Sequence, residues 1–268
     1  MRELLCLALG GLLMGQEVSL DSLAREAMAN KRRQDRDLTE YTHEYDFRFQ
    51  YFDGKGKLTK TIHEEGEGFQ SSQRNLKVAL KWNDRPVAPA IIAKKREEAG
   101  KKLQADFERR LKQDTLSGGE GPEYGSNLFG LRFEIYRILR HCPLENLRTE
   151  VLDGRRMHVF DYQSAAAAGK EKPPLTEIRG TFWVDAADRM LRRYTTVIAT
   201  GPSAGHLLWQ EDHRKVLNRA WMVERILLNT NAQLPGWKAP RVTWVSSFTG
   251  YQRFGVEVEQ KMEAPRPQ

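Results

Sequence analysis

The chain has 268 residues, of which 40% are hydrophobic and 29% are charged, and it contains two cysteines. This composition excludes a miniature protein held together by disulfides and a chain too polar to bury a core. Lys and Arg total 43 against 36 Asp and Glu, so the formal net charge is +7 at pH 7. The excess is modest, and it restricts the partners without selecting one.

The first fifteen residues have the pattern of an export signal. A cationic start at Arg2 precedes an apolar run over residues 4–14, and a small residue follows at Gly15. A secretory signal peptide combines a charged start, an apolar stretch of about 7–15 residues and a cleavage site of small residues. We therefore expect residues 1–15 to be a signal peptide and the mature protein to be periplasmic; a buried N-terminal helix is the alternative. No segment reaches the roughly 20 apolar residues of a membrane-spanning helix, so no transmembrane span is expected in the mature protein.

Removal of residues 1–15 would leave Cys142 as the only cysteine, which excludes an internal disulfide. His141 precedes it, and a reactive thiolate needs a basic, partly exposed setting. Side chains of adjacent residues usually diverge in direction. We therefore interpret Cys142 as a buried bystander rather than a nucleophile.

Helical periodicity comes first in the mature chain. Apolar side chains recur on one side of residues 20–33, and Ser19 or Asp21 is placed to cap this helix. A second helix is predicted over residues 90–113, where an apolar side chain recurs every fourth residue in a highly charged background. So narrow a stripe indicates a helix that lies on another element.

Between these helices the pattern changes to period two, which is typical of strands. Residues 45–51 alternate aromatic and polar side chains, so one face of that strand is aromatic. The turn sequence at residues 53–56 (DGKG) predicts that residues 57–69 return as the partner strand. Residues 76–82 alternate in the same way and predict a third antiparallel strand with one apolar face.

The segment after the second helix is harder to assign. Residues 117–127 are rich in glycine and predict a flexible connector. Residues 128–141 fit both a strand and a helix, and we favour a helix that ends before Pro143.

The C-terminal half reads as strands and turns. The predicted hairpins pair residues 147–152 with 157–162, 178–185 with 190–199, 207–217 with 221–231, and 241–250 with 253–258. Residues 263–268 are expected to form a flexible tail. A sheet of about ten or eleven strands must curl or close to hide its edges. We therefore predict an α+β fold, mostly antiparallel β, in which residues 16–262 form one strongly curved half-barrel that wraps the helices.

The sequence contains no recognisable catalytic or metal-binding motif. No HExxH, zinc-type cysteine–histidine spacing, GxSxG, phosphate-binding loop or GxGxxG after a strand is present. His206 and His213 lie an odd number of residues apart, so a strand would place them on opposite faces, and we interpret them as solvated surface histidines. The run Glu211-Asp212-His213 suggests an acid–base pair, but neighbours on a strand point apart, so we interpret it as ordinary strand polarity. Asp185 and Asp188 are typical turn residues. We predict no enzyme, no catalytic residue, no metal and no cofactor.

The basic residues do not form a nucleic-acid footprint. They interleave with Asp and Glu, as over residues 94–110, whereas a footprint would be a patch of one sign with stacking aromatic side chains. The aromatic residues instead follow period two, as a core requires. We therefore expect no nucleic-acid partner. Solubility and attraction to anionic membrane surfaces explain the charge equally well.

Several short segments carry a resemblance to a known family. They are residues 41–45 (YTHEY), 53–57 (DGKGK), 83–86 (NDRP), 180–185 (GTFWVD), 191–193 (LRR), 221–223 (WMV) and 251–254 (YQRF). Together with the order of the elements, they make most of the mature chain similar to the outer-membrane lipoprotein carrier (LolA-like) superfamily, especially to its longer, uncharacterised exported bacterial relatives. The resemblance implies an unclosed barrel around helices, with an apolar cavity that holds acyl chains. No functional residue of the family carries over to this sequence.

Our first hypothesis is a periplasmic binding or carrier protein that buries an apolar ligand, a lipid or a lipoprotein acyl chain, in a half-barrel cavity. The candidate lining residues are Phe47, Phe49, Leu80, Phe182, Trp209, Trp221 and Trp244. The competing interpretation is that these side chains fill a dry core. The alternative function is a structural or regulatory interaction protein of the envelope, with a filled barrel and the helix at residues 90–113 docking on a protein partner. A hydrolase with an unrecognised site is a weaker alternative.

Overall fold

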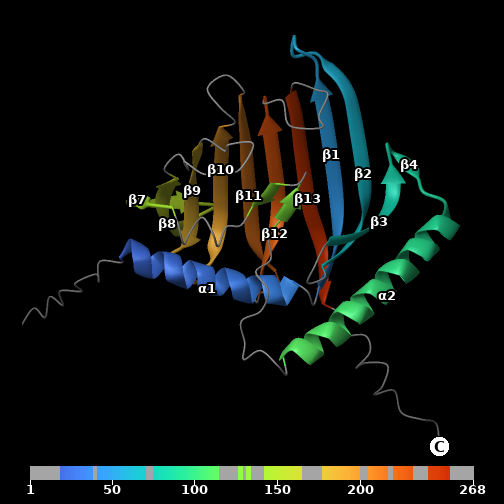
Figure 1. Ribbon diagram of the computed structural model, residues 1–268, viewed down its shortest axis with the longest axis horizontal. Coiled ribbons are helices and arrows are strands. Elements are labelled where there is room, and N and C mark those ends of the chain that lie inside the picture. The colour runs from blue at the N-terminus through green and yellow to red at the C-terminus, as the bar shows by residue number, and fades with distance from the viewer. Residues whose placement is uncertain are drawn as a thin grey trace, which may run out of the picture.

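The fold is described from a computed structural model of the chain (Figure 1). The structure describes residues 19–38, 41–70, 75–114, 126–128, 131–133, 142–164, 177–199, 205–216, 220–231 and 241–253. The predicted signal peptide and C-terminal tail lie outside the described residues.

Two helices and thirteen strands alternate along these residues in the order that the sequence pattern predicts for most of the chain. They are α1 (Leu20–Leu38), β1 (Tyr41–Phe52), β2 (Leu58–Gln70), β3 (Asn75–Trp82), β4 (Arg85–Pro86), α2 (Pro89–Asp114), β5 (Ser126–Leu128), β6 (Leu131–Phe133), β7 (Leu144–Leu152), β8 (Arg155–Gln163), β9 (Glu177–Asp185), β10 (Leu191–Ala199), β11 (His206–Val216), β12 (Ala220–Thr230) and β13 (Arg241–Arg253). Neither helix has an apolar stretch long enough to cross a membrane.

Eleven of the strands form one antiparallel sheet, in the order β4-β3-β2-β1-β13-β12-β11-β10-β9-β8-β7. Sequential strands are neighbours throughout, except where β1 pairs with β13 and joins the N-terminal strands to the C-terminal meander. The predicted hairpin turns at residues 53–56, 153–155 and 186–189 are confirmed. In the first, the Asp53 carboxylate accepts hydrogen bonds from the backbone N–H groups of Lys55 and Lys57, both at 2.9 Å.

The predicted curvature is wrong, whereas the antiparallel α+β architecture with eleven strands is confirmed. The sheet is open and is not strongly curled, and its two edges are β4 and β7. Both edges are protected locally: β4 has only two residues, and β7 is mostly exposed and carries charged side chains. Short and charged edges resist pairing with other chains, so this sheet does not need to close.

Helix α1 covers one face of the sheet, which we call the inner face. The Ser19 hydroxyl caps it by accepting a hydrogen bond from the Ser22 N–H at 3.2 Å. The predicted stripe is confirmed, since Leu23, Ala24 and Ala27 are buried in the core. The helix packs mainly against β12, β10 and β7 and crosses below these strands in the view of Figure 1.

Helix α2 packs on the opposite, outer face, against β3. Its Ala99 forms a small core cluster with Leu76 and Val78. Val78 pairs with Glu67 of β2. The residue before Glu67 is Gly66, which pairs with Tyr45 of β1 on the inner face. Because successive residues of a strand project to opposite faces, Glu67 and its partner Val78 project to the outer face. The prediction that the sheet wraps both helices is therefore wrong for α2.

Two other expectations also differ from the structure. Ser126–Leu128 and Leu131–Phe133 form a short antiparallel ribbon, where we expected the end of a connector and a helix. The rest of that expected helix, up to residue 141, lies outside the described residues. The last predicted hairpin is one continuous strand, because β13 passes Gly250 (φ 58°) at a register shift against β1 instead of turning.

Candidate ligand-binding face

The inner face is built from rows of side chains that run across the strands. Residues opposite each other in an antiparallel ladder project to the same face. One such row crosses eight strands: Phe49, Trp244, Leu228, Trp209, Thr196, Gly180, Tyr162 and Leu144. The next row toward α1 contains Phe47, Ser246, Ile226, Glu211, Tyr194, Phe182 and Phe160.

An aromatic cluster occupies the part of these rows on β1, β13 and β11. Phe49 stacks on Trp244 with ring centroids 5.3 Å apart and an interplanar angle of 4°. Phe47 and Trp209 both meet Trp244 at steeper angles, with centroids 6.1 Å and 5.9 Å away. Offset and edge-to-face ring pairs of this kind stabilise a packed cluster by about 0.5–1.5 kcal/mol each beyond their burial.

A second aromatic group lies on β8 and β9, and Gly180 makes room for it. The rings of Tyr162 and Phe182 stack with centroids 4.8 Å apart. The Tyr162 hydroxyl donates to the carbonyl oxygen of Thr195 at 2.9 Å, which draws the ring across Gly180. A Cβ atom at Gly180 would collide with this ring and with the same carbonyl oxygen, so the position requires glycine.

The structure brings together five of the seven residues that we predicted as cavity lining. Phe47, Phe182, Trp209 and Trp244 belong to the core cluster that α1 covers, and the partly buried Phe49 packs against it. Phe182 and Trp209 have no exposed surface.

The other two predicted residues lie elsewhere. Trp221 is buried outside that cluster, where its indole N–H donates to Asp188 at 3.1 Å and the guanidinium groups of Arg155 and Arg192 lie within 6 Å of its ring. Leu80 is half-buried at a register shift between β2 and β3, outside both core clusters.

A buried chain of polar groups lies within the apolar inner face. The Trp209 indole N–H donates to the Tyr194 hydroxyl at 3.1 Å, and that hydroxyl donates to a Glu211 carboxylate oxygen at 2.8 Å. The other carboxylate oxygen lies 2.9 Å from Nε2 of His213. His213 is therefore not the solvated histidine that we expected. Glu211 and His213 are two residues apart, and this spacing places both on the same face of the strand.

These contacts shift the titration of the buried groups. Burial alone would raise the pKa of Glu211, but His213, the Lys31 ammonium of α1 and the Tyr194 hydroxyl together hold it well below its usual range. Burial and the adjacent Glu211 carboxylate raise the pKa of Tyr194 well above its usual value. Glu211 is therefore charged and Tyr194 neutral at pH 7, so this cluster fixes α1 to the sheet electrostatically.

His43 lies near the start of β1, between the rings of Phe248 and Tyr251. The centroid of its ring is 5.4 Å from the centroid of each. Its own ring covers Gly68, where a Cβ atom would collide with it. Burial, with a smaller contribution from Lys77, lowers the pKa of His43 to about 4. His43 is therefore a neutral core side chain at pH 7.

Beyond the cluster, the inner face of β1–β3 carries a cation over its aromatic side chains. Nζ of Lys77 lies 3.8 Å from the centroid of the Phe47 ring, and the Tyr45 hydroxyl donates to Glu64 at 2.6 Å. Desolvation lowers the pKa of Lys77 to about 8, with Glu64 opposing the shift, so the ammonium is mostly charged at pH 7. Trp82, which pairs with the inner-face residue Glu64, is 47% exposed.

The residues that we considered as catalytic candidates have contacts typical of structural roles. Burial raises the pKa of the half-buried Cys142 thiol, which is opposite to the shift of a reactive thiolate. Asp185 accepts hydrogen bonds from the backbone N–H groups of Ala187 and Asp188 at 2.9 Å and 3.0 Å, which confirms its role in the turn. His206 is exposed and faces away from His213, as predicted.

The outer face of β10–β13 is hollowed by a pocket of about 350 Å³. Charged side chains dominate its lining, among them Arg192, Arg193, Arg214, Asp212 and Glu224. Most of these charges are paired within the pocket: Arg193 contacts Asp212, and Arg192 and Arg214 contact Glu224 at 3.6 Å and 4.0 Å. This polar pocket differs in character and in face from the apolar cavity that we predicted.

The outer face of β1 and β2 also brings together Asp46, His63 and Glu65, which we did not predict as a group. The sequence does contain the signal. Asp46 pairs directly with Glu65 in the first hairpin. His63 precedes Glu65 by two residues in the same strand and therefore lies on the same face. The predicted turn and the strand alternation would together have placed these three side chains side by side.

Comparison with known proteins leaves the sequence without a family assignment. The sequence matches no protein-family profile, and it matches no curated protein significantly.

Several solved structures are similar over most of this chain, all at low sequence identity. A domain described as an outer membrane lipoprotein-sorting protein from Vibrio parahaemolyticus is 11% identical with a TM-score of 0.42, over 91% of this chain and 97% of that one. A LolA superfamily protein from Nitrosomonas europaea is 9% identical with a TM-score of 0.39, over 90% and 96%. The lipoprotein LppX from Mycobacterium tuberculosis is 10% identical with a TM-score of 0.30, over 88% and 96%.

Proposed function

We propose that the protein is an exported carrier that binds an acyl chain on the inner face of β1–β3. The observation that carries this proposal is an aromatic surface outside the main contacts of both helices. The partly buried Phe49 and the exposed Trp82 share this face by the register of β1, β2 and β3, and the buried Phe47 lies on it at the margin of the core cluster. Helix α1 packs mainly against β12, β10 and β7, and α2 covers the opposite face of β3.

The energetics of such a surface suit an apolar ligand. Removal of apolar area from water contributes about 25 cal/mol per Å², so an acyl chain that buries a few hundred Å² gains several kcal/mol. Phe49 is only partly buried and stacks on Trp244, so it joins the exposed surface to the core cluster. The proposed ligand lies along this edge, where its contacts need no displacement of the fully buried rings.

Lys77 adds a preference for an acidic head group. Its ammonium lies directly over the Phe47 ring, beside the path proposed for the acyl chain. A cation next to an apolar surface matches the chemistry of a fatty acid, whose carboxylate and hydrocarbon need different partners. We therefore expect a fatty acid to bind more tightly than the fatty alcohol of the same length.

The test is equilibrium binding of a fluorescent fatty-acid analogue to the purified protein, with competition by palmitate and by hexadecanol. We expect Phe49→Glu to abolish binding, because it places a carboxylate on the apolar surface beside the head group's own negative charge. Val151→Glu, at an exposed position on the far edge strand β7, is the matched control and should bind like the unchanged protein. Lys77→Met should remove the preference for palmitate over hexadecanol while leaving hexadecanol binding intact.

The same experiment separates the carrier from the other functional class. A correctly folded protein that binds neither competitor contradicts the carrier proposal and favours an interaction protein with a filled core. The charged surface of α2 is then the docking candidate, and it retains an exposed Ile91 in its first turn. Equal loss of binding in Phe49→Glu and Val151→Glu would show adsorption of the probe rather than a site on the inner face.

A further inference from the structure

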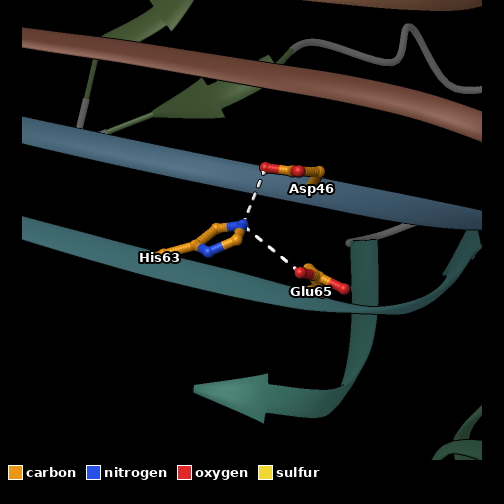
Figure 2. Close-up of side chains that lie close together, drawn as sticks. All are labelled: Asp46, His63 and Glu65. Carbon is orange, nitrogen blue, oxygen red and sulfur yellow. Dashed lines mark ion pairs between the residues drawn. The ribbon is translucent and has the colours of Figure 1, made fainter. Parts of the chain in front are cut away.

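Three potential metal ligands converge on the outer face at the first hairpin. Figure 2 shows His63 of β2 with its Nε2 atom directed between Asp46 of β1 and Glu65 of β2. Nε2 lies 3.2 Å from Oδ1 of Asp46 and 3.6 Å from Oε1 of Glu65. The three groups come from adjacent strands of a rigid sheet, so their spacing is set by the backbone register.

The turn between β3 and β4 holds the His63 ring in place. The Asn83 side chain accepts a hydrogen bond from the His63 N–H at 2.9 Å, and the Asn83 N–H donates to the His63 carbonyl oxygen at 2.7 Å. Oδ1 of Asp84 lies 2.7 Å from Nδ1 of the ring. A carboxylate on one ring nitrogen is the usual partner of a histidine whose other nitrogen binds a metal, because it fixes the ring and makes it more basic.

The His63 ring has an unused nitrogen at the centre of the cluster. Nε2 is buried and has no hydrogen-bond partner within the part of the chain that the structure describes, although two carboxylate oxygens lie within 4 Å. The oxygens therefore flank the nitrogen rather than lie in line with it. Two ligands of a tetrahedral zinc ion with bonds of about 2.0–2.2 Å lie about 3.3–3.6 Å apart. The separations of 3.2 Å and 3.6 Å from Nε2 to the two oxygens are close to this range.

We propose that Asp46, His63 and Glu65 bind a divalent first-row transition cation such as Zn²⁺, with Asp84 orienting the histidine. One imidazole nitrogen and two carboxylate oxygens suit zinc and its neighbours, whereas Mg²⁺ and Ca²⁺ prefer ligands that are all oxygen. Three protein ligands leave one tetrahedral position for solvent.

Two cationic side chains near the site, Arg48 and Lys81, contact its carboxylates and therefore affect its affinity for a metal ion. Arg48 forms a hydrogen bond with each carboxylate oxygen of Asp46, both at 3.3 Å. Lys81 binds the Glu65 oxygen that faces away from His63, at 2.8 Å, and so leaves Oε1 for the metal. Since Arg48 competes for the same oxygen that faces His63, we expect Arg48→Gln to tighten zinc binding.

The test is titration of the untagged full chain with Zn²⁺ in competition with a chromophoric chelator. We expect one site per chain, at least a tenfold weaker affinity in His63→Ala, and unchanged affinity in His206→Ala, which removes an exposed histidine outside the cluster. Asp84→Asn should weaken binding by about 10–100-fold, as loss of an orienting carboxylate does at metal sites. With Co²⁺ in place of Zn²⁺, binding should give the intense visible d–d bands of a tetrahedral site, and His63→Ala should weaken or remove them.

Equal Zn²⁺ affinity in the unchanged protein and in His63→Ala would overturn the proposal, as would displacement of Zn²⁺ by millimolar Mg²⁺. Circular dichroism establishes whether His63→Ala folds. If it does not, the near-isosteric pair Asp46→Asn and Glu65→Gln carries the test, since each keeps the shape of the side chain and removes the charged ligand. Normal Zn²⁺ affinity in both of these variants would equally refute the site.

Discussion

The two ends of the sheet differ in how many hydrophobic side chains they bury. Under α1, the meander β8–β13 and β1 contribute most of a large core whose central rings have no exposed surface. Under α2, the buried core is three residues: Leu76, Val78 and Ala99. Stability is therefore concentrated at the meander, whereas the exposed aromatic surface and the proposed metal ligands lie at the N-terminal end. A ligand or cation can bind there without disturbing the main core.

The largest difference between the two ends should appear on truncation of Phe182. The ring is fully buried and packs against Phe160 and Tyr162 in a row that has little room to collapse. Phe182→Ala should lower the free energy of unfolding by about 3–5 kcal/mol. Urea denaturation followed by circular dichroism measures this change. A loss below about 1 kcal/mol would mean that the row is loosely packed and that stability is not concentrated at the meander.

The next largest effect is a pH dependence centred on His43, which lies where the two ends meet. Its pKa is lowered to about 4 in the folded protein, against about 6.5 in the unfolded chain. Between these values the unfolded chain binds more protons, so stability is complete above pH 6.5 and falls as the pH falls toward 4. Integrated over this window, the loss is roughly 3 kcal/mol.

His43→Phe keeps a ring over Gly68 and removes the titration. Its unfolding free energy should therefore change less than that of the unchanged protein between pH 6.5 and 4. Burial also lowers the pKa of His158, which contributes in the same direction in both proteins and cancels in the difference. The low pKa of Glu211 acts in a lower window, since its stabilising charge is lost only as the pH falls below the usual glutamate range. Parallel pH profiles for both proteins would contradict the assignment to His43.

A smaller effect is expected at the α2 end. Val78→Ala removes two methyl groups from a cluster that is buried on one side only, and should lower the free energy of unfolding by roughly 2 kcal/mol. The same urea series measures it beside Phe182→Ala. If α2 merely rests on the sheet, the variant should also raise the amide exchange of α2 while leaving α1 protected. Equal exchange in both helices would indicate one cooperative core.

Local pattern predicted much of the fold because hairpins are local. Period-two alternation and turns such as Asp53–Gly56 fix which residues pair, so the strand order of the meander follows from the chain itself. Curvature and the side on which α2 packs do not follow, because they depend on how each edge and face is covered by distant segments. Leu76 and Val78 were recognised as a dry face, but only their pairing with β2 shows that this face is opposite to α1.

The candidate site was predictable to the same limited degree. The rings of Phe47, Phe49 and Trp244 were expected to share a face, and they do, because alternation alone determines it. Trp221 does not follow this alternation, because a register shift interrupts the pairing of β12 with β11. No turn residue in the sequence marks that shift. The pairing of Glu211 with His213 was missed for a simpler reason: adjacent residues were compared, although on a strand the second neighbour shares the face.

The smallest predicted effect tests how far α1 depends on its own sequence rather than on the core beneath it. Ser19→Ala removes the hydroxyl that accepts the Ser22 N–H and should lower stability by about 1 kcal/mol. Ser19→Asp restores an acceptor and adds a charge that favours the helix N-terminus, so it should recover or exceed the original stability. Thermal unfolding of the three proteins measures both steps. Equal stability of all three would show that Leu23, Ala24 and Ala27 hold α1 in place without its cap, and that tertiary packing alone fixes where this helix begins.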